Sequence, residues 1–378
     1  MTPFPLIHID GSPGRRGRMY GEAACAAIHR SLTFYTESII PAAGLSWGKL
    51  CDDVMERVPR WREAEPDLIE EAEGIAAGAG LEFADVLALN TRGTFVQTDG
   101  KQGEAEPEEG CTSFAVLPEA SRDGHMRTGQ NWDYLKGIRE SIVLVHITPE
   151  VGPRMLMMVE AGQLGRHGAN ENGVALHANG LTSRLRDYNG LPSTFWRRQI
   201  LREPIFTKAL AAATKTPRVG STNLVISHRD GFAVDLETRP HTARWLHPEG
   251  GWLAHTNHFL SEIPPEIADT YEPDADSIVR YGRIEQLMNQ YASGGGITFD
   301  DLATILKDHR FADVDGICTH ARPNDAPEDA WESVASVITD LTTGVMAVSS
   351  GPPCKGSYVN IEIASGNVIG AVQSDTLP

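Results

Sequence analysis

The sequence predicts an α+β fold in which antiparallel sheets stack on one another and helices cover their outer faces. Three observations lead to this prediction: a helical N-terminal part, a strand-rich region that begins near residue 111, and two helical blocks that interrupt the strands. Strands joined by short turns, with helices in separate groups, are typical of α+β proteins and not of proteins that alternate strand and helix.

The first part of the chain, up to about residue 95, has mainly helical patterns. Residues 19–40 carry apolar side chains at helical spacing and end before Pro41, a residue that helix interiors disfavour. Residues 66–76 begin with a proline and acidic residues, which the first turn of a helix prefers. A third helix is expected at 83–89.

A change of composition divides the chain near residue 110. Residues 98–110 are acidic, contain glycine and proline, and are almost free of apolar side chains. Such a composition predicts an exposed linker. We therefore expect a helical segment, residues 1–110, that packs on a β-rich core formed by residues 111–378.

The strand-rich region contains many short apolar or alternating runs that are separated by turn residues. The expected strands are 113–118, 125–131, 141–148, 154–160, 173–178, 222–227, 231–236, 335–341, 345–349 and 357–363. The two helical blocks are 193–215 and 275–308. Asp123-Gly124 predicts a turn that joins the first two strands into a hairpin.

The charge balance limits the classes of partner. The 378 residues include 51 acids and 33 bases, for a net charge of −18, so neither nucleic acid nor an anionic membrane is an expected partner. No apolar run reaches the roughly 18–20 residues of a membrane helix, and the first residues lack a secretory signal pattern. We expect a cytoplasmic protein.

The five cysteines do not form a recognisable framework. Cys25, Cys51, Cys111, Cys318 and Cys354 are odd in number, widely spaced and without a CxxC pair. Neither a set of disulfides nor a structural zinc site is expected. Each cysteine is then either a small core residue or a reactive thiol.

Cys111 is the candidate nucleophile because it follows Gly110 at the junction of linker and first strand. Its thiol could attack the Gly110 carbonyl, and hydrolysis of the resulting thioester would leave Cys111 with a free α-amine. An α-amine has an unperturbed pKa of about 7.7–8.0 and serves as a general base near neutral pH. The same dipeptide also fits the start of a strand with a small buried residue.

Asp133 is the candidate partner of this amine. A hairpin centred on residue 122 places Asp133 opposite Cys111, where its carboxylate could hold the ammonium group or orient the thiol. An aspartate that merely caps a turn at the end of the strand is the alternative reading.

Asparagine side chains are suitable donors to the oxyanion that acyl transfer generates. Asn257 and, less directly, Asn179 are the candidates, although either also suits a turn. His255 and His258 lie three residues apart, but no third metal ligand follows nearby, so they are read as structural. No nucleotide-binding or nucleophile-elbow motif is present, and neither a cofactor nor a metal is expected.

These markers together resemble a known family. They are Gly110-Cys111-Thr112, Gly129-Gln130-Asn131-Trp132-Asp133, Glu160-Ala161-Gly162, Gly168-Ala169-Asn170-Glu171-Asn172-Gly173, Ser221-Thr222-Asn223-Leu224, His255-Thr256-Asn257-His258 and Ile317-Cys318-Thr319-His320. Their order is similar to that of the acyl-coenzyme A:6-aminopenicillanic acid acyltransferase-like proteins, the peptidase C45 family of N-terminal-nucleophile (Ntn) hydrolases.

The resemblance implies a four-layer αββα fold, self-cleavage between Gly110 and Cys111, associated α and β subunits, and a thioester on Cys111. It also implies that Asp133 is the active-site aspartate and Asn257 the oxyanion asparagine, with Asn179 carried over from related bile salt hydrolases and penicillin V acylases. That related group has arginine where this chain has Gln130. The penicillin acyltransferase has an arginine just before its late strand. The matching residues of this chain, 329–332, contain no arginine, and the nearest one is Arg322.

Because of these departures, the resemblance implies neither the hydrolysis of bile salts nor acyl transfer to or from penicillins. The hypothesis is a self-processing Ntn amide hydrolase or acyltransferase, without cofactor, that acts on a small N-acyl amine, N-acyl amino acid or peptide. Acyl-CoA would enter as a substrate. The alternatives are an uncleaved cysteine acyltransferase that uses an acyl thioester donor, and a non-catalytic member of the fold. A homo-oligomer is left open.

Overall fold

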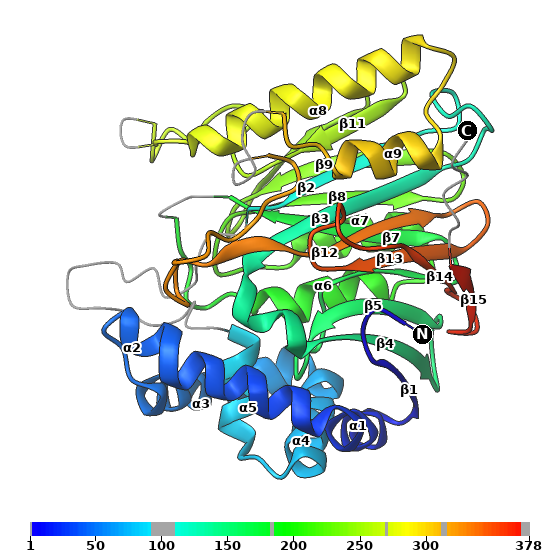
Figure 1. Ribbon diagram of the computed structural model, residues 1–378. Helices are drawn as coiled ribbons and strands as arrows, with labels where there is room; N and C mark the ends of the chain where they lie inside the picture. The colour runs from blue at the N-terminus through cyan, green and yellow to red at the C-terminus, as the bar shows by residue number, and fades with distance from the viewer. Residues whose placement is uncertain (1, 92–109, 182–184, 269–270, 311–315, 372–378) are drawn as a thin grey trace.

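Two stacked β-sheets lie between layers of helices (Figure 1). The computed structural model describes residues 2–91, 110–181, 185–268, 271–310 and 316–371. Strands β2 and β3 of one sheet contact β7 and β8 of the other, whereas helices contact the opposite face of each sheet. The predicted α+β fold with four layers is confirmed.

The first sheet has eight strands in the order β1-β4-β5-β6-β7-β8-β9-β10. Their bounds are β1 Leu6–Gly11, β4 Ile142–Pro149, β5 Met155–Glu160, β6 His167–Asn170, β7 Val174–Gly180, β8 Thr222–His228, β9 Phe232–Thr238 and β10 Ala243–Leu246. All neighbouring strands are antiparallel except β1, which pairs with β4 in parallel. The N-terminal segment therefore contributes a strand to this sheet.

The second sheet has seven strands in the order β11-β2-β3-β12-β13-β14-β15. Their bounds are β2 Thr112–Val116, β3 Arg127–Leu135, β11 Trp252–His255, β12 Trp331–Asp340, β13 Val345–Ser350, β14 Val359–Glu362 and β15 Val368–Ala371. Strand β2 lies between β11 and β3, so the residues at its start have neighbours on both sides.

Helices α8 and α9, which span Ala275–Ser293 and Phe299–Leu306, cover the second sheet through contacts with β11 and β12. Helix α6, Ser193–Leu201, contacts β6 and β7 of the first sheet and is followed by α7, Phe206–Lys215. The N-terminal helices form one group at the end of the molecule (Figure 1). They are α1 Pro13–Phe34, α2 Ile40–Ala42, α3 Trp47–Ala64, α4 Pro66–Ala79 and α5 Phe83–Thr91, with a π-helical turn at Tyr35–Ile39.

Glycines allow α1 and α4 to pack with their backbones in close contact. A Cβ atom on Gly17 would overlap the carbonyl of Glu71, and one on Gly74 would meet the Gly14 carbonyl at 2.5 Å. The buried carboxylate of Glu71 also pairs with Arg16 of α1 at 2.8 Å and with Arg198 of α6 at 3.2 Å. This ion triad joins the N-terminal helices to the helix layer of the first sheet.

Every strand and helix expected from the sequence has a counterpart, although the ends differ, by six residues where 19–40 was expected and α1 spans Pro13–Phe34. Several other elements were not expected. These are β1, β6, β10, β11, β15 and α3. Four of these strands have only four residues, too few for a periodic pattern to be detected. Helix α3 contains Pro59, which obscures its helical pattern.

None of the described helices combines the length and the apolar character that a membrane crossing requires.

Candidate active site

Three of the predicted site residues meet where β2 begins. Thr112 pairs with Asn131 of β3, and Ser113 pairs with His255 of β11. Continuing the second register two residues past β11 places Asn257 opposite Cys111. The nucleophile candidate therefore lies between the end of β11 and strand β3.

The hairpin of β2 and β3 is confirmed, but the predicted register is wrong by one residue. Thr112 pairs with Asn131, so Cys111 extends toward Trp132 and not Asp133. The connection includes an additional turn in which Ser121 N donates to the Leu117 carbonyl at 3.1 Å, and this turn removes the symmetry assumed about residue 122.

Asp133 nevertheless lies against the Gly110–Cys111 peptide. The backbone N–H of Gly110 donates to the Asp133 carbonyl at 3.2 Å, and the thiol Sγ of Cys111 lies 4.0 Å from the same oxygen. A Cβ atom built on Gly110 would lie 3.4 Å from the Cβ of Asp133. The aspartate and the expected scissile bond are thus in contact.

The carboxyl group of Asp133 is buried and only partly hydrogen bonded. Ser333 Oγ donates to its Oδ1 at 2.5 Å, whereas its Oδ2 has no hydrogen-bond partner among the residues that the structure describes. Burial raises the pKa of Asp133 to about 7, although the nearby Arg280 and the Ser333 hydroxyl act in the opposite direction. A buried acceptor of this kind is suited to binding a new cation or donor.

Arg280 of α8 is the functional candidate that the sequence analysis missed. Its guanidinium, only 1% exposed, donates to the Cys111 carbonyl at 2.8 Å, Thr112 Oγ1 at 3.1 Å and Asn257 Oδ1 at 3.0 Å. It also pairs with Asp276 at 2.5 Å. The arginine therefore holds the start of β2 and the oxyanion candidate in one arrangement.

A signal for Arg280 exists in the sequence. The buried positions of α8 include Ser277, Arg280, Ile284 and Leu287, which follow a helical repeat on one face. An arginine in a core-facing position of an amphipathic helix needs a buried partner, and this requirement marks it as a candidate.

Asn257 is fixed on both sides of its amide. Its Oδ1 accepts from Arg280, so the amide orientation places Nδ2 toward the Gly180 carbonyl, to which it donates at 3.1 Å. The backbone N–H of Asn257 donates to Ser277 Oγ at 2.7 Å. Arg280 and Ser277, both on α8, thus hold the side chain and the backbone of Asn257 beside Cys111.

Asn179 occupies a different environment. Its Nδ2 lies 2.8 Å from Ser113 Oγ, 3.1 Å from Asn223 Oδ1 and 3.0 Å from the His255 carbonyl. Because an amide has two N–H groups, these acceptors occupy its donors. Asn179 therefore bridges the two sheets, and so does Gln130, whose amide exchanges hydrogen bonds with the backbone of Ala178.

The two histidines near Asn257 have protein partners. His255 Nε2 lies 3.0 Å from Glu237 Oε1 and its Nδ1 2.8 Å from the Thr256 carbonyl. His258 Nδ1 lies 2.8 Å from Ser277 Oγ, and burial lowers the pKa of His258 to about 4. Their contacts suit the structural interpretation and not a metal site.

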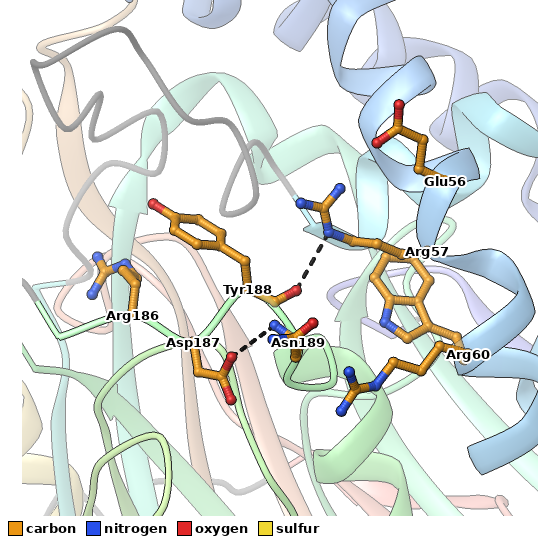
Figure 2. Close-up of a pocket in the computed structure, with 8 residues that line it drawn as sticks. Glu56, Arg57, Arg60, Arg186, Asp187, Tyr188 and Asn189 are labelled. Carbon is orange, nitrogen blue, oxygen red and sulfur yellow. Dashed lines mark hydrogen bonds between the residues drawn. The ribbon is translucent and has the colours of Figure 1, made fainter.

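A separate cavity of about 530 Å³ lies between α3 and residues 186–189 (Figure 2). Arg57 and Arg60 line it from α3, and Arg186 and Asp187 line it from the opposite segment. Arg57 Nε donates to the Tyr188 carbonyl at 3.4 Å. Its described lining does not include Cys111 or the residues around it, so this cavity is not part of the candidate active site.

Comparison with known proteins places the chain in a family. Residues 121–341 match the model of the acyl-coenzyme A:6-aminopenicillanic acid acyl-transferase family. A relative from Emericella nidulans, the acyl-coenzyme A:6-aminopenicillanic-acid-acyltransferase 40 kDa form, is 29% identical over 297 residues, 76% of this chain and 78% of the relative. The family model and this relative indicate an enzyme of the acyl-transfer class. The chain belongs to the acyl-coenzyme A:6-aminopenicillanic acid acyl-transferase family.

Solved structures with similarity to the chain include two hydrolases. One is the Caenorhabditis elegans orthologue of N-acylethanolamine-hydrolyzing acid amidase, 15% identical with a TM-score of 0.45, covering 61% of this chain and 93% of that one. The other is a variant of conjugated bile acid hydrolase from Clostridium perfringens, 13% identical with a TM-score of 0.46, covering 64% of this chain and 89% of that one.

Proposed function

We propose that the chain is a self-processing amide hydrolase or acyltransferase that cuts itself between Gly110 and Cys111 and then uses Cys111 as nucleophile. Residues 1–110 and 111–378 would remain associated as two subunits. The observation that carries the proposal is Asp133: its Oδ2 is a buried acceptor without a described partner, and its Cβ lies beside the Gly110–Cys111 peptide.

Cleavage would supply the donor that this carboxyl group lacks. The thiol of Cys111 adds to the Gly110 carbonyl, the peptide nitrogen leaves as an amine, and water hydrolyses the thioester. The new α-ammonium would lie beside Asp133, whose negative form it favours. Burial raises the pKa of this carboxyl to about 7 because a buried negative charge is unfavourable in the uncut chain. A neighbouring cation would stabilise that charge after cleavage.

The same residues provide an acyl-transfer cycle. In its neutral form the α-amine of Cys111 accepts the thiol proton, the thiolate attacks an acyl carbonyl, and Asn257 stabilises the oxyanion. Arg280 orients Asn257 through its Oδ1. The ammonium group formed in this step then protonates the leaving group, and water or a second amine resolves the thioester. The proposed substrates are small N-acyl amines, N-acyl amino acids or peptides, with acyl-CoA as a further acyl donor.

Intact-mass spectrometry under denaturing conditions tests the proposal. The purified chain should give two fragments that meet at Gly110/Cys111, whereas Cys111→Ala should give one intact chain. Cys25→Ala is the matched control, because this half-buried cysteine lies in α1 and should leave cleavage unchanged. An uncut native chain, or cutting of Cys111→Ala at the same bond, would refute self-processing.

A second measurement separates an enzyme from an inert member of the fold. The fragment 111–378 should gain the mass of the acyl group when it is quenched during turnover of an activated acyl ester. The added mass should be absent in Cys111→Ala and should map to Cys111. Acylation of another residue with equal efficiency would contradict the role of this thiol.

A further inference from the structure

A second group of chemically reactive side chains lies outside the candidate active site. It consists of His309, Cys318, His320 and Cys354, whose nitrogen and sulfur ligand atoms all lie within 4.8 Å of one another. From the sequence no structural zinc site was expected, because no pair of cysteines has a CxxC spacing. The four residues come from three segments that only the fold brings together.

His320 is at the centre of this cluster. Its Nε2 lies 3.0 Å from His309 Nε2, 3.7 Å from Cys318 Sγ and 3.3 Å from Cys354 Sγ. A tetrahedral zinc ion, with bonds of about 2.3 Å to sulfur and about 2.0–2.1 Å to nitrogen, holds its ligand atoms about 3.3–3.8 Å apart. The three separations from His320 Nε2 are close to this range, and all four ligand atoms lie within 4.8 Å of one another.

We propose that His309, Cys318, His320 and Cys354 bind one Zn²⁺ ion in a structural Cys₂His₂ site. Two thiolates and two imidazoles make a complete tetrahedral ligand set, which is typical of structural and not catalytic zinc. Binding would release the two thiol protons, and it would leave no position on the metal for substrate.

The surrounding backbone supports a fixed site. Cys318 N donates to the Asp308 carbonyl at 3.1 Å, which joins the segment of His309 to that of Cys318. The carboxylate of Asp308 is in turn bound by Arg283 of α8 at 2.7 Å. Cys354 is exposed whereas Cys318 is buried, so a metal ion would have a route of entry from solvent.

The proposed site is connected to Asp133 by a short chain of hydrogen bonds. Thr319, between two of the ligands, donates its N–H to Ser333 Oγ at 3.0 Å, and that hydroxyl donates to Asp133 Oδ1 at 2.5 Å. Ser333 N also donates to the Thr319 carbonyl at 3.0 Å. A metal that fixes residues 318–320 would therefore help to position the aspartate beside Cys111.

Two other states of the cluster compete with a metal. Cys318 and Cys354 could form a disulfide, because their sulfur atoms lie within 4.8 Å of one another. The two histidines could instead share a proton across the 3.0 Å that separates their Nε2 atoms. Neither competitor uses all four side chains, whereas a zinc ion does.

Metal analysis of the full-length protein tests the proposal and does not depend on enzymatic activity. Protein purified without chelator and without a histidine tag should contain about one zinc per chain. Cys354→Ser and His309→Ala should each bind zinc more than about 100-fold more weakly, since even outer-shell changes cost about 10–100-fold. Cys51→Ser and His241→Ala are matched controls away from the cluster and should retain zinc.

Cobalt supplies a second readout that reports coordination directly. Protein stripped of metal and titrated with Co²⁺ should show the visible bands of a tetrahedral ion and thiolate-to-cobalt charge transfer. Cys354→Ser should lose part of the charge-transfer intensity while retaining its circular dichroism spectrum.

Several results would overturn the assignment. They are a native chain that neither contains nor binds zinc, zinc content unchanged by both ligand variants, stoichiometric copper or iron instead of zinc, and a Cys318–Cys354 disulfide in the non-reduced protein by peptide mapping. If cleavage at Gly110 fails while zinc is present, the metal site stands and the proposed function falls. The two hypotheses are thus tested separately.

Discussion

Replacement of Arg280 is the sharpest test of how the candidate site is held together. Arg280→Met keeps the apolar stem but removes the guanidinium from Cys111 O, Thr112 Oγ1 and Asn257 Oδ1, and leaves Asp276 without its cation. Breaking one partner of a buried ion pair costs about 3–5 kcal/mol. For 378 residues, an unfolding entropy of about 2.1 cal/mol/K per residue converts this to a loss of about 4–6 °C in Tm.

The assay is thermal unfolding in a Cys111→Ala background, so that all chains have the same covalent form. Arg280→Lys keeps the charge but loses the planar fork, and it should give an intermediate Tm. Arg154→Gln is the control, because its ion pair with Glu171 is partly exposed, at 45% and 24%, and should be worth at most about 1 kcal/mol.

The chemical role of Arg280 requires a second readout. With Cys111 present, Arg280→Met should slow self-cleavage at least about tenfold, which corresponds to ~1.4 kcal/mol in the barrier. Arg280→Lys should recover part of the rate. A Tm within 1 °C of the parent, or a cleavage rate equal to that of Arg154→Gln, would show that the guanidinium does not organise the site.

Three further predictions concern the aspartate and the helix packing. In the uncut Cys111→Ala chain, burial raises the pKa of Asp133 to about 7, above the unfolded value of about 3.9, so the folded chain binds more protons between these pH values. The free energy of unfolding of this chain should therefore fall with rising pH, by at most about 1.4 kcal/mol per pH unit. Asp133→Asn should remove this slope, and a pH-independent difference between variant and parent would refute the shift. Ser333→Ala removes the donor to Asp133 and should lower the free energy of unfolding, measured in urea, by about 1–3 kcal/mol. It should also slow self-cleavage, and Ser333→Thr should restore the rate. Equal cleavage rates for the native chain and both variants would contradict this prediction. Gly17→Ala should destabilise the chain by about 1–3 kcal/mol because its Cβ overlaps the Glu71 carbonyl. The control is Gly48→Ala, whose Cβ meets no atom within 4 Å and which should stabilise the chain slightly. Similar melting temperatures for the two variants would argue against close packing of α1 on α4.

The sequence predicts the elements of the site better than their exact alignment. The change from linker to strand at Gly110 and the turn at Asp123-Gly124 are local signals, so Cys111 and its hairpin could be found without a structure. The register could not, because the extra turn near Leu117 depends on contacts with Gly251, whose carbonyl accepts from Leu117 N at 2.8 Å. Strand β11, which brings Asn257 beside Cys111, is too short to give a pattern of its own.

Residues that act across the fold are the ones that sequence reasoning loses. Cys318 and His320 are two residues apart, and β12 holds their segment and that of Cys354: Ser333 N donates to the Thr319 carbonyl, and Gly351 N donates to the Val334 carbonyl at 2.9 Å. His309 joins them through the bond from Cys318 N to the Asp308 carbonyl at 3.1 Å. The β-bulge between Ser333 and Ala335 lies in this same stretch of β12.

The bulge also explains why one strand can support both sites. A bulge changes which face of a strand its side chains occupy, and here Ser333 reaches Asp133 while its backbone remains paired with Thr319. The carboxyl group beside Cys111 is therefore held by a strand whose irregular start is fixed by the Cys318–His320 segment. Loss of a cluster ligand should then act on the geometry of Asp133 before it acts on the global fold, because the sheet pairing of β12 continues independently beyond Ala335.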